Sequence, residues 1–196
     1  MRAEEVIERF KRTGALLEGH FILSSGLHSA SYLQCALVLQ HPVEAEAFGR
    51  ALAAEFQGQR IETVASPAIG GLVIGYEVAR ALNAKFIWTE RDAEGRMTLR
   101  RGFTIRPGES VLVVEDVITT GGSTRETIGA LTQDGARVVG AASIIDRSAG
   151  RADVGVPRTA LATLEVPAVA PTACEACARG DEAVKPGSRK AVTSDR

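Results

Sequence analysis

The feature that most constrains the fold of this chain is a repeated alternation of strand-like and helix-like segments. Short runs rich in Val, Ile and Ala are followed by longer segments whose apolar residues recur at helical spacing. The strand-like runs occupy residues 61–67, 84–90, 109–116, 137–146 and 159–166, and the helix-like segments between them include 70–82 and 123–135. Alternation at this spacing is typical of βαβ units. We therefore expect an α/β fold, with a mainly parallel, twisted sheet flanked by helices.

The remaining segments predict one domain with a small addition near the N-terminus. An amphipathic helix opens the chain, and Pro42 begins another helix that continues to Phe56. Residues 20–34 predict two short strands around a turn of Ser and Gly residues. Within a single domain of residues 1–196, we assign N-terminal hood elements to 14–40, the core to 43–166 and a tail to 167–196. We expect the tail to lie on the surface or against a partner.

Composition excludes several classes of function. Lys and Arg total 23 against 24 for Asp and Glu, so no overall field would attract nucleic acid and any anion site must be local. The longest uncharged apolar runs, such as 138–145, are too short to cross a bilayer, and the N-terminus does not look like a signal peptide. The three cysteines, Cys35, Cys174 and Cys177, form no disulfide framework, so we expect a cytoplasmic protein without membrane or nucleic-acid partners.

The candidate site lies in VLVVEDVITTGGSTRE, the segment from residue 111 to residue 126. In a doubly wound sheet, ligands bind beyond the carboxyl ends of the strands, where Glu115 and Asp116 are expected. Two neighbouring carboxylates can accept hydrogen bonds from two sugar hydroxyls and help to hold a divalent cation. The alternative is a polar strand end that is merely solvated.

The turn that follows suits a phosphate group. Its backbone amides and the positive end of the next helix favour a dianion, and Gly121 and Gly122 can take positive φ and let the backbone approach the ligand. Ser123 and Glu126 match a capping box, so we expect Ser123 to be the N-cap. The pattern is neither a Walker loop nor a dinucleotide-binding fingerprint. An ordinary loop is the alternative.

The segment from 111 to 124 resembles the ribose-phosphate signature of the type I phosphoribosyltransferases. Other segments resemble the branch of that family that acts on orotate: GHFILSSGLHSASYLQ resembles its hood, SPAIGG its pyrophosphate loop, and SIIDRSAG its strand that ends in Asp-Arg. ERDAEGRMTLRRGF and CEACARGDEAVKPGSRK are most similar to members associated with Thermus. The likeness extends from about Gly14 to Lys190 and implies the type I fold with a small N-terminal hood.

The resemblance implies transfer of the 5-phosphoribosyl group from phosphoribosyl diphosphate to orotate, in pyrimidine synthesis, by a homodimer. It also implies Mg²⁺, held mainly by the substrate near Glu115 and Asp116. Two alternatives stay open: a phosphoribosyltransferase for a purine or another base, and a non-catalytic regulator that senses phosphoribosyl diphosphate. The turn does not separate the acceptor bases, because it contacts only the shared sugar phosphate. A regulator would usually carry a basic nucleic-acid-binding face, which the balanced charge does not indicate.

The resemblance further implies roles for particular residues. Phosphoribosyl diphosphate would be bound by Glu115, Asp116, Val117, Ile118, Thr119, Thr120, Gly121, Gly122 and Ser123. Its pyrophosphate would meet the amides of Ala68, Ile69, Gly70 and Gly71. Orotate would be bound by Thr119, Arg147, Tyr32 and Leu33, with Arg147 facing its carboxylate. If the resemblance is set aside, Arg147 could be a surface arginine, and Tyr32 and Leu33 could be core residues. Residues 68–71 could then be an ordinary strand–helix turn.

Two positions depart from the family pattern. Many orotate enzymes carry a lysine in the hood and another in the pyrophosphate loop, where this chain has Ser24 and Gly70. A mobile loop at 91–102 could compensate by closing over the site and neutralising the pyrophosphate. Arg91 matches a basic catalytic position of that loop in the family. Looser matches are Arg96, Arg100 and Arg101. The alternative is a charged hairpin that faces water.

Cys174-x-x-Cys177 is a further motif, typical of zinc sites. Zinc normally takes four ligands, and this pair supplies two. Two tails paired in a symmetric dimer could complete the set, but we expect surface thiols. His20, His28 and His41 lack the context of a catalytic triad, so we expect them to be exposed or hydrogen bonded, with a substrate contact left open for His28 in the hood turn.

Overall fold

The computed structural model describes residues 1–23 and 26–185, which divide into two compact units. Unit 1 consists of Met1–Ala15 and Cys35–Glu165. Unit 2 consists of Leu16–Gln34 and the tail that begins at Val166. Ser24, one of the two positions that depart from the family pattern, lies outside the described residues.

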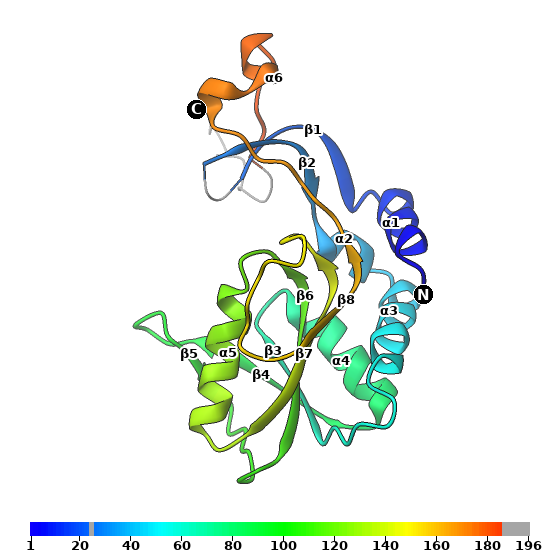
Figure 1. Cartoon of the computed structure of the whole chain (residues 1–196), viewed down its shortest axis with the longest axis vertical. Coiled ribbons are helices and arrows are strands. Elements are labelled where there is room, and N and C mark those ends of the chain that lie inside the picture. The colour runs from blue at the N-terminus through cyan, green and yellow to red at the C-terminus, as the bar shows by residue number, and fades with distance from the viewer. Residues whose placement is uncertain (24–25, 186–196) are drawn as a thin grey trace, which may run out of the picture. The chain divides into compact units, whose positions relative to one another are not determined.

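Unit 1 is built on a six-stranded sheet with the order β5-β4-β3-β6-β7-β8 (Figure 1). Its strands are β3 (Thr63–Pro67), β4 (Lys85–Arg91), β5 (Met97–Leu99), β6 (Ser110–Ile118), β7 (Arg137–Asp146) and β8 (Arg158–Thr163). All neighbours are parallel except β4 and β5, which form an antiparallel pair at one edge. The predicted, mainly parallel sheet is therefore confirmed.

Helices cover both faces of this sheet. They are α1 (Ala3–Arg12), α2 (Cys35–Leu39), α3 (Pro42–Ala54), α4 (Gly71–Leu82) and α5 (Gly122–Gln133). Helices α3 and α4 lie on one face and α5 on the other (Figure 1). Small residues allow close packing: a Cβ at Gly75 would lie 2.0 Å from Ser66 Oγ, and one at Gly49 would lie 2.6 Å from Glu77 Cβ.

The core of unit 1 is continuous and apolar. Val111, Leu112, Val113 and Val114 in β6 are completely buried, as are Ile144 and Ile145 in β7. On α1, Val6 and Phe10 are also fully buried, and the Phe10 ring lies 5.8 Å from that of Phe48 in α3. Each such side chain contributes about 1.5–3 kcal/mol through burial. The sheet is therefore a rigid base for the loops at its edge.

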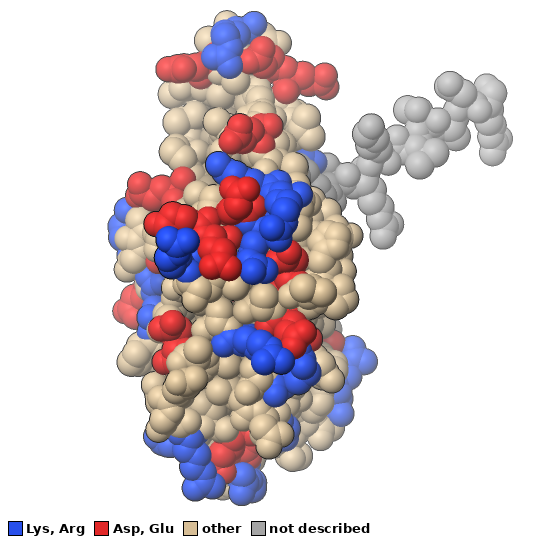
Figure 2. Space-filling view, turned by 90° about the vertical axis from the view of Figure 1, so that its right-hand side faces the viewer, with Lys and Arg blue, Asp and Glu red and all other residues tan. Residues whose placement is uncertain are grey.

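Surface charge on the α1 and α3 side is paired rather than concentrated. Figure 2 shows basic and acidic side chains intermixed on the face that it presents. Glu44 of α3 accepts hydrogen bonds from Arg9 and Arg12 of α1, at 2.5 Å and 2.6 Å. No helix in the described ranges is long and apolar enough to span a membrane.

Unit 2 is a hairpin joined to the tail. Strands β1 (Leu16–Ile22) and β2 (His28–Leu33) are antiparallel, and the tail adds one turn of 3-10 helix (Pro171–Ala173) and the short helix α6 (Glu175–Ala178). Val169 of the tail bridges to His28, and Val184 bridges to Phe21. The hairpin was predicted from the sequence. Its association with the tail, which we expected on the surface or against a partner, was not.

Candidate active site

Two loops leave the sheet side by side at its carboxyl edge. Strands β3 and β6 are parallel neighbours, with Thr63 opposite Val111 and Ala65 opposite Val113, so the loops that follow them emerge together. A Cβ placed at Gly70 would lie 2.8 Å from Asp116 Oδ1. The loop that we predict to meet the pyrophosphate therefore lies beside the acid pair. A larger residue at position 70 would have to displace the Asp116 carboxylate. In the same loop the Ala68–Ile69 peptide bond is cis.

The acid pair lies within β6 rather than after it, because the strand continues to Ile118. Successive side chains of a strand point to opposite faces, so the two carboxyl groups do not lie side by side. Glu115 accepts a short hydrogen bond from the Thr124 hydroxyl in α5. Asp116 faces Gly70 and the thiol of Cys35, and its Oδ1 accepts the Val117 N–H at 3.0 Å.

Both acids have raised pKa values. Burial raises the pKa of Glu115 to about 7, against the hydrogen bond from Thr124 and with a smaller contribution from the neighbouring Asp116 charge. Burial also raises the pKa of Asp116, although the Val117 amide and the Cys35 thiol oppose it. The pKa of Cys35 is raised by its own burial and by the Asp116 charge. Carboxyl groups whose pKa values are raised by burial, at the carboxyl edge of a sheet, indicate a candidate functional site.

The turn between β6 and α5 depends on one glycine. Gly121 is the N-cap of α5 with φ +74°, and a Cβ there would lie 2.7 Å from Val154 Cγ1. Both the left-handed conformation and the lack of space therefore require glycine. The predicted N-cap at Ser123 is wrong, since α5 already begins at Gly122 and no side chain caps it. Glu126 pairs instead with Arg91, at 2.7 Å.

A polar pocket of about 440 Å³ opens beside this turn. It is lined by Thr119, Thr120, Arg125, Arg147, Ser148, Arg151, Ala152 and Asp153. Three arginines provide the local positive charge that an anion needs in a chain without net positive charge. Its volume is in the usual range for small-molecule sites.

Arg125 lies in the quoted segment 111–126 but was not among the predicted site residues, and Arg151 is brought to the turn only by the fold. Arg125 donates a hydrogen bond to the Thr120 carbonyl at 3.0 Å and another to the Asp153 carbonyl. It therefore ties the turn to the loop that follows β7. Cys35, which lies beside Asp116, is likewise visible only in the structure.

The loop after β7 is fixed by Asp146. Burial alone would raise the pKa of this carboxyl, but hydrogen bonds from Ser148, Arg158 and the Gly150 amide lower it to about 2. Next to it, the Arg147 N–H donates to the Ile118 carbonyl at 2.8 Å. The Arg147 charge also lowers the pKa of Cys35, although burial and the Asp116 charge raise it overall. Arg147 lines the polar pocket beside the turn, and its contact with the orotate carboxylate stays a prediction.

The arginine-rich segment forms a hairpin on β4 and β5. Arg91 donates to the Gly95 carbonyl at 2.6 Å in addition to its pair with Glu126. Arg96 pairs with Asp92 at 3.0 Å. Arg101 holds Glu90 through two hydrogen bonds, of 3.0 Å and 2.8 Å. The three side chains therefore contact local acids. Arg100 is exposed.

Tyr32 and Leu33 lie on β2 in unit 2. The Tyr32 ring packs against Phe21 with centroids 5.8 Å apart, and Leu33 is buried. Their role in covering a base stays a prediction.

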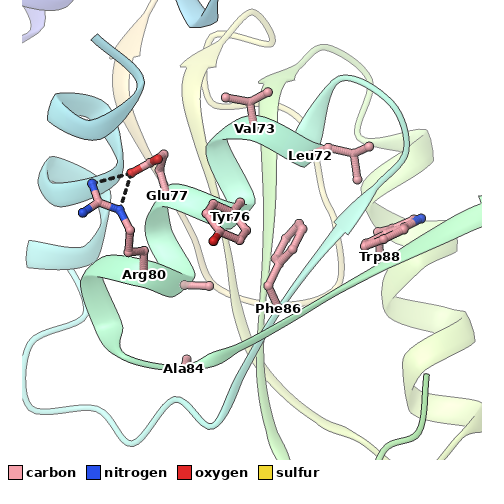
Figure 3. A pocket seen from close by; sticks show the side chains of 9 residues that line it. Leu72, Val73, Tyr76, Glu77, Arg80, Ala84, Phe86 and Trp88 are labelled. Atoms are coloured by element: carbon pink, nitrogen blue, oxygen red, sulfur yellow. Dashed lines mark hydrogen bonds and ion pairs between the residues drawn. The ribbon is translucent and has the colours of Figure 1, made fainter. Parts of the chain in front are cut away.

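A larger depression, of about 660 Å³, lies elsewhere on unit 1 (Figure 3). Leu72 and Tyr76 on α4 lie beside Trp88 and Phe86 on β4, with the Tyr76 and Phe86 ring centroids 5.9 Å apart (Figure 3). Its two charged residues are paired, because Arg80 lies 2.7 Å from Glu77 and also 3.1 Å from Glu46 of α3. The depression is mainly apolar and its charged side chains are paired with each other or with α3, so we do not assign the active site to it.

The fold and this site define a class of protein. Residues 37–162 match the family model described as the phosphoribosyl transferase domain. The match covers more than half of the chain, and the chain belongs to this family.

Comparison with individual proteins narrows the class. A relative from Pelotomaculum thermopropionicum named orotate phosphoribosyltransferase is 55% identical over 190 residues, which cover 97% of this chain and all of the relative. The protein of that name from Thermus thermophilus is 49% identical over 176 residues, which cover 90% of this chain and 96% of the relative. The predicted likeness to the orotate branch, including its Thermus members, is confirmed.

Solved structures agree with the fold. The orotate phosphoribosyltransferase of Aeropyrum pernix superposes with a TM-score of 0.67 at 29% identity and covers 81% of this chain and 93% of its own. An adenine phosphoribosyltransferase from Thermoanaerobacter pseudethanolicus has a TM-score of 0.60 at 16% identity, over 68% of this chain and 88% of its own. The second likeness concerns the fold alone.

Proposed function

We propose that this chain transfers the 5-phosphoribosyl group from phosphoribosyl diphosphate to orotate, giving orotidine 5′-phosphate and pyrophosphate. One observation carries the proposal: the loop after β3, the acids of β6 and the turn into α5 meet at one edge of the sheet, with Gly70 directly against Asp116. A sugar with a phosphate on one side and a diphosphate on the other needs such an arrangement. The names of the relatives indicate orotate as the acceptor.

The turn, the acids and the pyrophosphate loop are assigned to successive parts of the donor. The 5-phosphate binds in the turn from Val117 to Ser123, where backbone amides precede the positive end of α5. The ribose hydroxyls donate to Asp116, on the side of the pyrophosphate loop, and to Glu115, on the side of α5. The diphosphate lies against the amides of residues 68–71. This order follows the order of the loops along the edge.

Arg147 is assigned to the orotate carboxylate. A planar guanidinium can hold a carboxylate through two parallel hydrogen bonds. The loop that carries it is anchored by Asp146 and by the Ile118 carbonyl, so little ordering remains to be done on binding. Thr119, which lines the same pocket, is assigned to the base, and Tyr32 and Leu33 are assigned to cover it.

Mg²⁺ fits the donor set of the site. Carboxylate oxygens are ligands that this ion prefers, and Mg²⁺ would be held mainly by oxygens of the substrate, near Asp116 and Glu115. When bound, the ion neutralises charge that develops on the leaving pyrophosphate. A nearby cation also favours the ionised forms of two acids whose pKa values burial raises.

The reaction requires no protein nucleophile. A ring nitrogen of orotate forms a bond to the anomeric carbon, while the bond from that carbon to the pyrophosphate oxygen breaks and its electron pair leaves with pyrophosphate. The protein holds the two reactants in line and excludes water. Arg91 is assigned to the leaving pyrophosphate, with Arg96, Arg100 and Arg101 in support. For this role the ion pair between Arg91 and Glu126 must break, so that Arg91 can bind the pyrophosphate instead.

We further propose a cytoplasmic homodimer. The apolar depression of Figure 3 is bordered by Val73 and Tyr76, which are 46% and 57% exposed. Exposed apolar side chains gathered around a depression are typical of protein interfaces. Light scattering on Tyr76→Glu would test the assembly, since a charge at this face should shift a dimer to monomers. A variant that stays dimeric would place the interface elsewhere.

The activity is tested with a panel of acceptor bases. Purified protein with phosphoribosyl diphosphate and Mg²⁺ should convert orotate to its nucleotide, as resolved by chromatography, and leave adenine, hypoxanthine and xanthine unchanged. Asp134→Asn, an exposed acid at the end of α5, is the matched control for changes at Asp116. Reaction with a purine but not with orotate would contradict the proposal that orotate is the acceptor. Binding of phosphoribosyl diphosphate without turnover of any base would favour the sensing regulator.

A further inference from the structure

Four side chains of unit 2 converge on one point. The ligand-type atoms of His20, His28, Cys174 and Cys177 all lie within 4.8 Å of one another. His20 Nε2 lies 2.8 Å from His28 Nδ1, 3.3 Å from Cys174 Sγ and 3.6 Å from Cys177 Sγ. Cys177 Sγ lies 3.2 Å from His28 Nδ1. We propose that these residues form a structural zinc site that joins the tail to the hairpin.

The spacing fits a tetrahedral ion. With Zn–S near 2.3 Å and Zn–N near 2.0–2.1 Å, the edges of a tetrahedral Cys₂His₂ site measure roughly 3.3–3.8 Å. The sulfur–nitrogen distances here fall within or just below this range, and the two nitrogens need to separate by about half an ångström. Two thiolates and two neutral imidazoles give a neutral centre around Zn²⁺, which suits the buried positions of His28 and Cys174.

Local structure aims each ligand. Cys174 is the N-cap of α6 and Cys177 lies within its single turn. Because the two residues are three positions apart, their side chains face the same side. In the hairpin, Ile22 pairs with His28, and His20 lies two residues before Ile22, at the irregularity between Glu18 and Phe21. The two imidazole rings meet across the hairpin, with their centroids 4.8 Å apart.

The outer contacts also match a metal site. His20 Nδ1 lies 3.0 Å from the Asp181 carbonyl, which leaves Nε2 as the ligand atom. A histidine that binds metal usually donates its other ring N–H to such an oxygen. The tail is tied to the same residues through its backbone: the His28 N–H donates to the Val169 carbonyl and the Val184 N–H to the His20 carbonyl, both at 2.8 Å.

Unit 2 needs such a link because its core is small. The buried side chains in the described part of this unit are those of Phe21, His28, Ser29, Leu33 and Cys174. Two of these five belong to the cluster. Small units with so few buried apolar groups are commonly held by a metal or by disulfides. Four protein ligands leave no open position, so the site is structural rather than catalytic.

The alternative from the sequence, two tails sharing zinc across a dimer, is not needed. His20 and His28 of the same chain supply the missing pair. The expectation that the two cysteines are surface thiols is wrong for Cys174, which is buried. The proposal does not depend on the transferase activity, because none of the four residues is assigned to the substrate.

Elemental analysis of protein without an affinity tag tests the site. We expect one zinc ion per chain after gel filtration, and loss of at least nine-tenths of it in His20→Ala and in Cys177→Ser. The matched controls are His41→Ala and Cys35→Ser, which remove a histidine and a thiol outside the cluster and should keep the zinc. Zinc retained in Cys177→Ser, or lost equally in Cys35→Ser, would overturn the proposal.

A second measurement does not rely on variants that fold. Refolding the unmodified protein with Co²⁺ should give the thiolate-to-cobalt absorption and the visible bands of a tetrahedral ion, and X-ray absorption of the zinc form should show two sulfur and two nitrogen ligands. Protein that holds no zinc and takes up neither ion when titrated would contradict the site. A Cys174–Cys177 disulfide in freshly isolated protein would do so as well.

Discussion

The two units of this molecule bury different kinds of side chain. In unit 1, fully buried Val, Leu and Ile residues of β6 and β7 support a polar site at the sheet edge. In unit 2, the described buried residues are few, and imidazole and thiol groups are prominent among them. The difference teaches that a large apolar core can stabilise a fold that contains buried acids such as Asp116. A small core needs an additional link, which in unit 2 is the proposed zinc site.

Removal of zinc would test this comparison with the largest expected effect. Chelation, or the double change Cys174→Ser and Cys177→Ser, should increase amide hydrogen exchange in β1 and β2 by about 100-fold or more, because zinc contributes on the order of 10 kcal/mol to small zinc modules. Exchange in β6 and β7 should not change. Cys35→Ser, which removes a thiol of unit 1, should leave β1 and β2 protected. Unchanged exchange in β1 and β2 after chelation would show that the tail is held without metal.

Asp116→Asn should separate function from stability within unit 1. Turnover should fall by about 100-fold or more, as it does when a group that stabilises developing charge is lost. The melting temperature should stay within about 3 °C, because the amide has the same shape and keeps an acceptor for the Val117 N–H. Steady-state kinetics and calorimetry give the two values. A large loss of stability with modest loss of turnover would make Asp116 a structural residue.

Glu115→Gln should change how stability depends on pH. Since the folded pKa of Glu115 is raised from 4.5 to about 7, its protonated form favours folding below about pH 4.5, and this contribution is lost as pH rises through about 7. The loss is at most about 3.5 kcal/mol, at about 1.4 kcal/mol for each of the roughly 2.5 pKa units between 4.5 and 7. Urea unfolding at a series of pH values should show a flatter profile for the variant. If stability depends on pH with the same slope in both proteins, the pKa of Glu115 is not raised.

Arg147→Ala should have a smaller and more selective effect. Loss of a charged hydrogen bond is expected to raise the KM for orotate by about 10- to 100-fold, and the KM for phosphoribosyl diphosphate by far less. Arg151→Ala, which removes another arginine of the same pocket, controls for the general loss of positive charge. If Arg147→Ala weakens both substrates equally, the residue does not contact the orotate carboxylate.

Much of the fold could be predicted because long apolar strands leave a clear pattern. The run from Val111 to Val114 is buried on both faces, as in a central parallel strand, and the sequence shows it. Strand β5 has three residues and α2 has five, which is too short for any periodicity to appear. Both were missed for that reason.

The candidate active site and the proposed zinc site also differ in how far the sequence predicts them. The acids and the turn are contiguous in sequence, so their order alone indicates a phosphorylated sugar. The failure at Ser123 arose because the N-cap is decided by tertiary packing of Gly121 against Val154. The zinc ligands are further apart: 154 residues separate His20 from Cys174, and no local pattern joins the histidines to the cysteines. Only the pairing of the hairpin with the tail brings them together.

The most direct test of the assignment of the β6–α5 turn is a crystal structure of the protein with phosphoribosyl diphosphate and Mg²⁺. We predict density for the 5-phosphate at the amides of residues 119–123, for the ribose hydroxyls at Asp116 and Glu115, and for the diphosphate beside Gly70. A ligand bound elsewhere while this crevice holds only solvent, at a concentration that saturates the protein in calorimetry, would contradict the account.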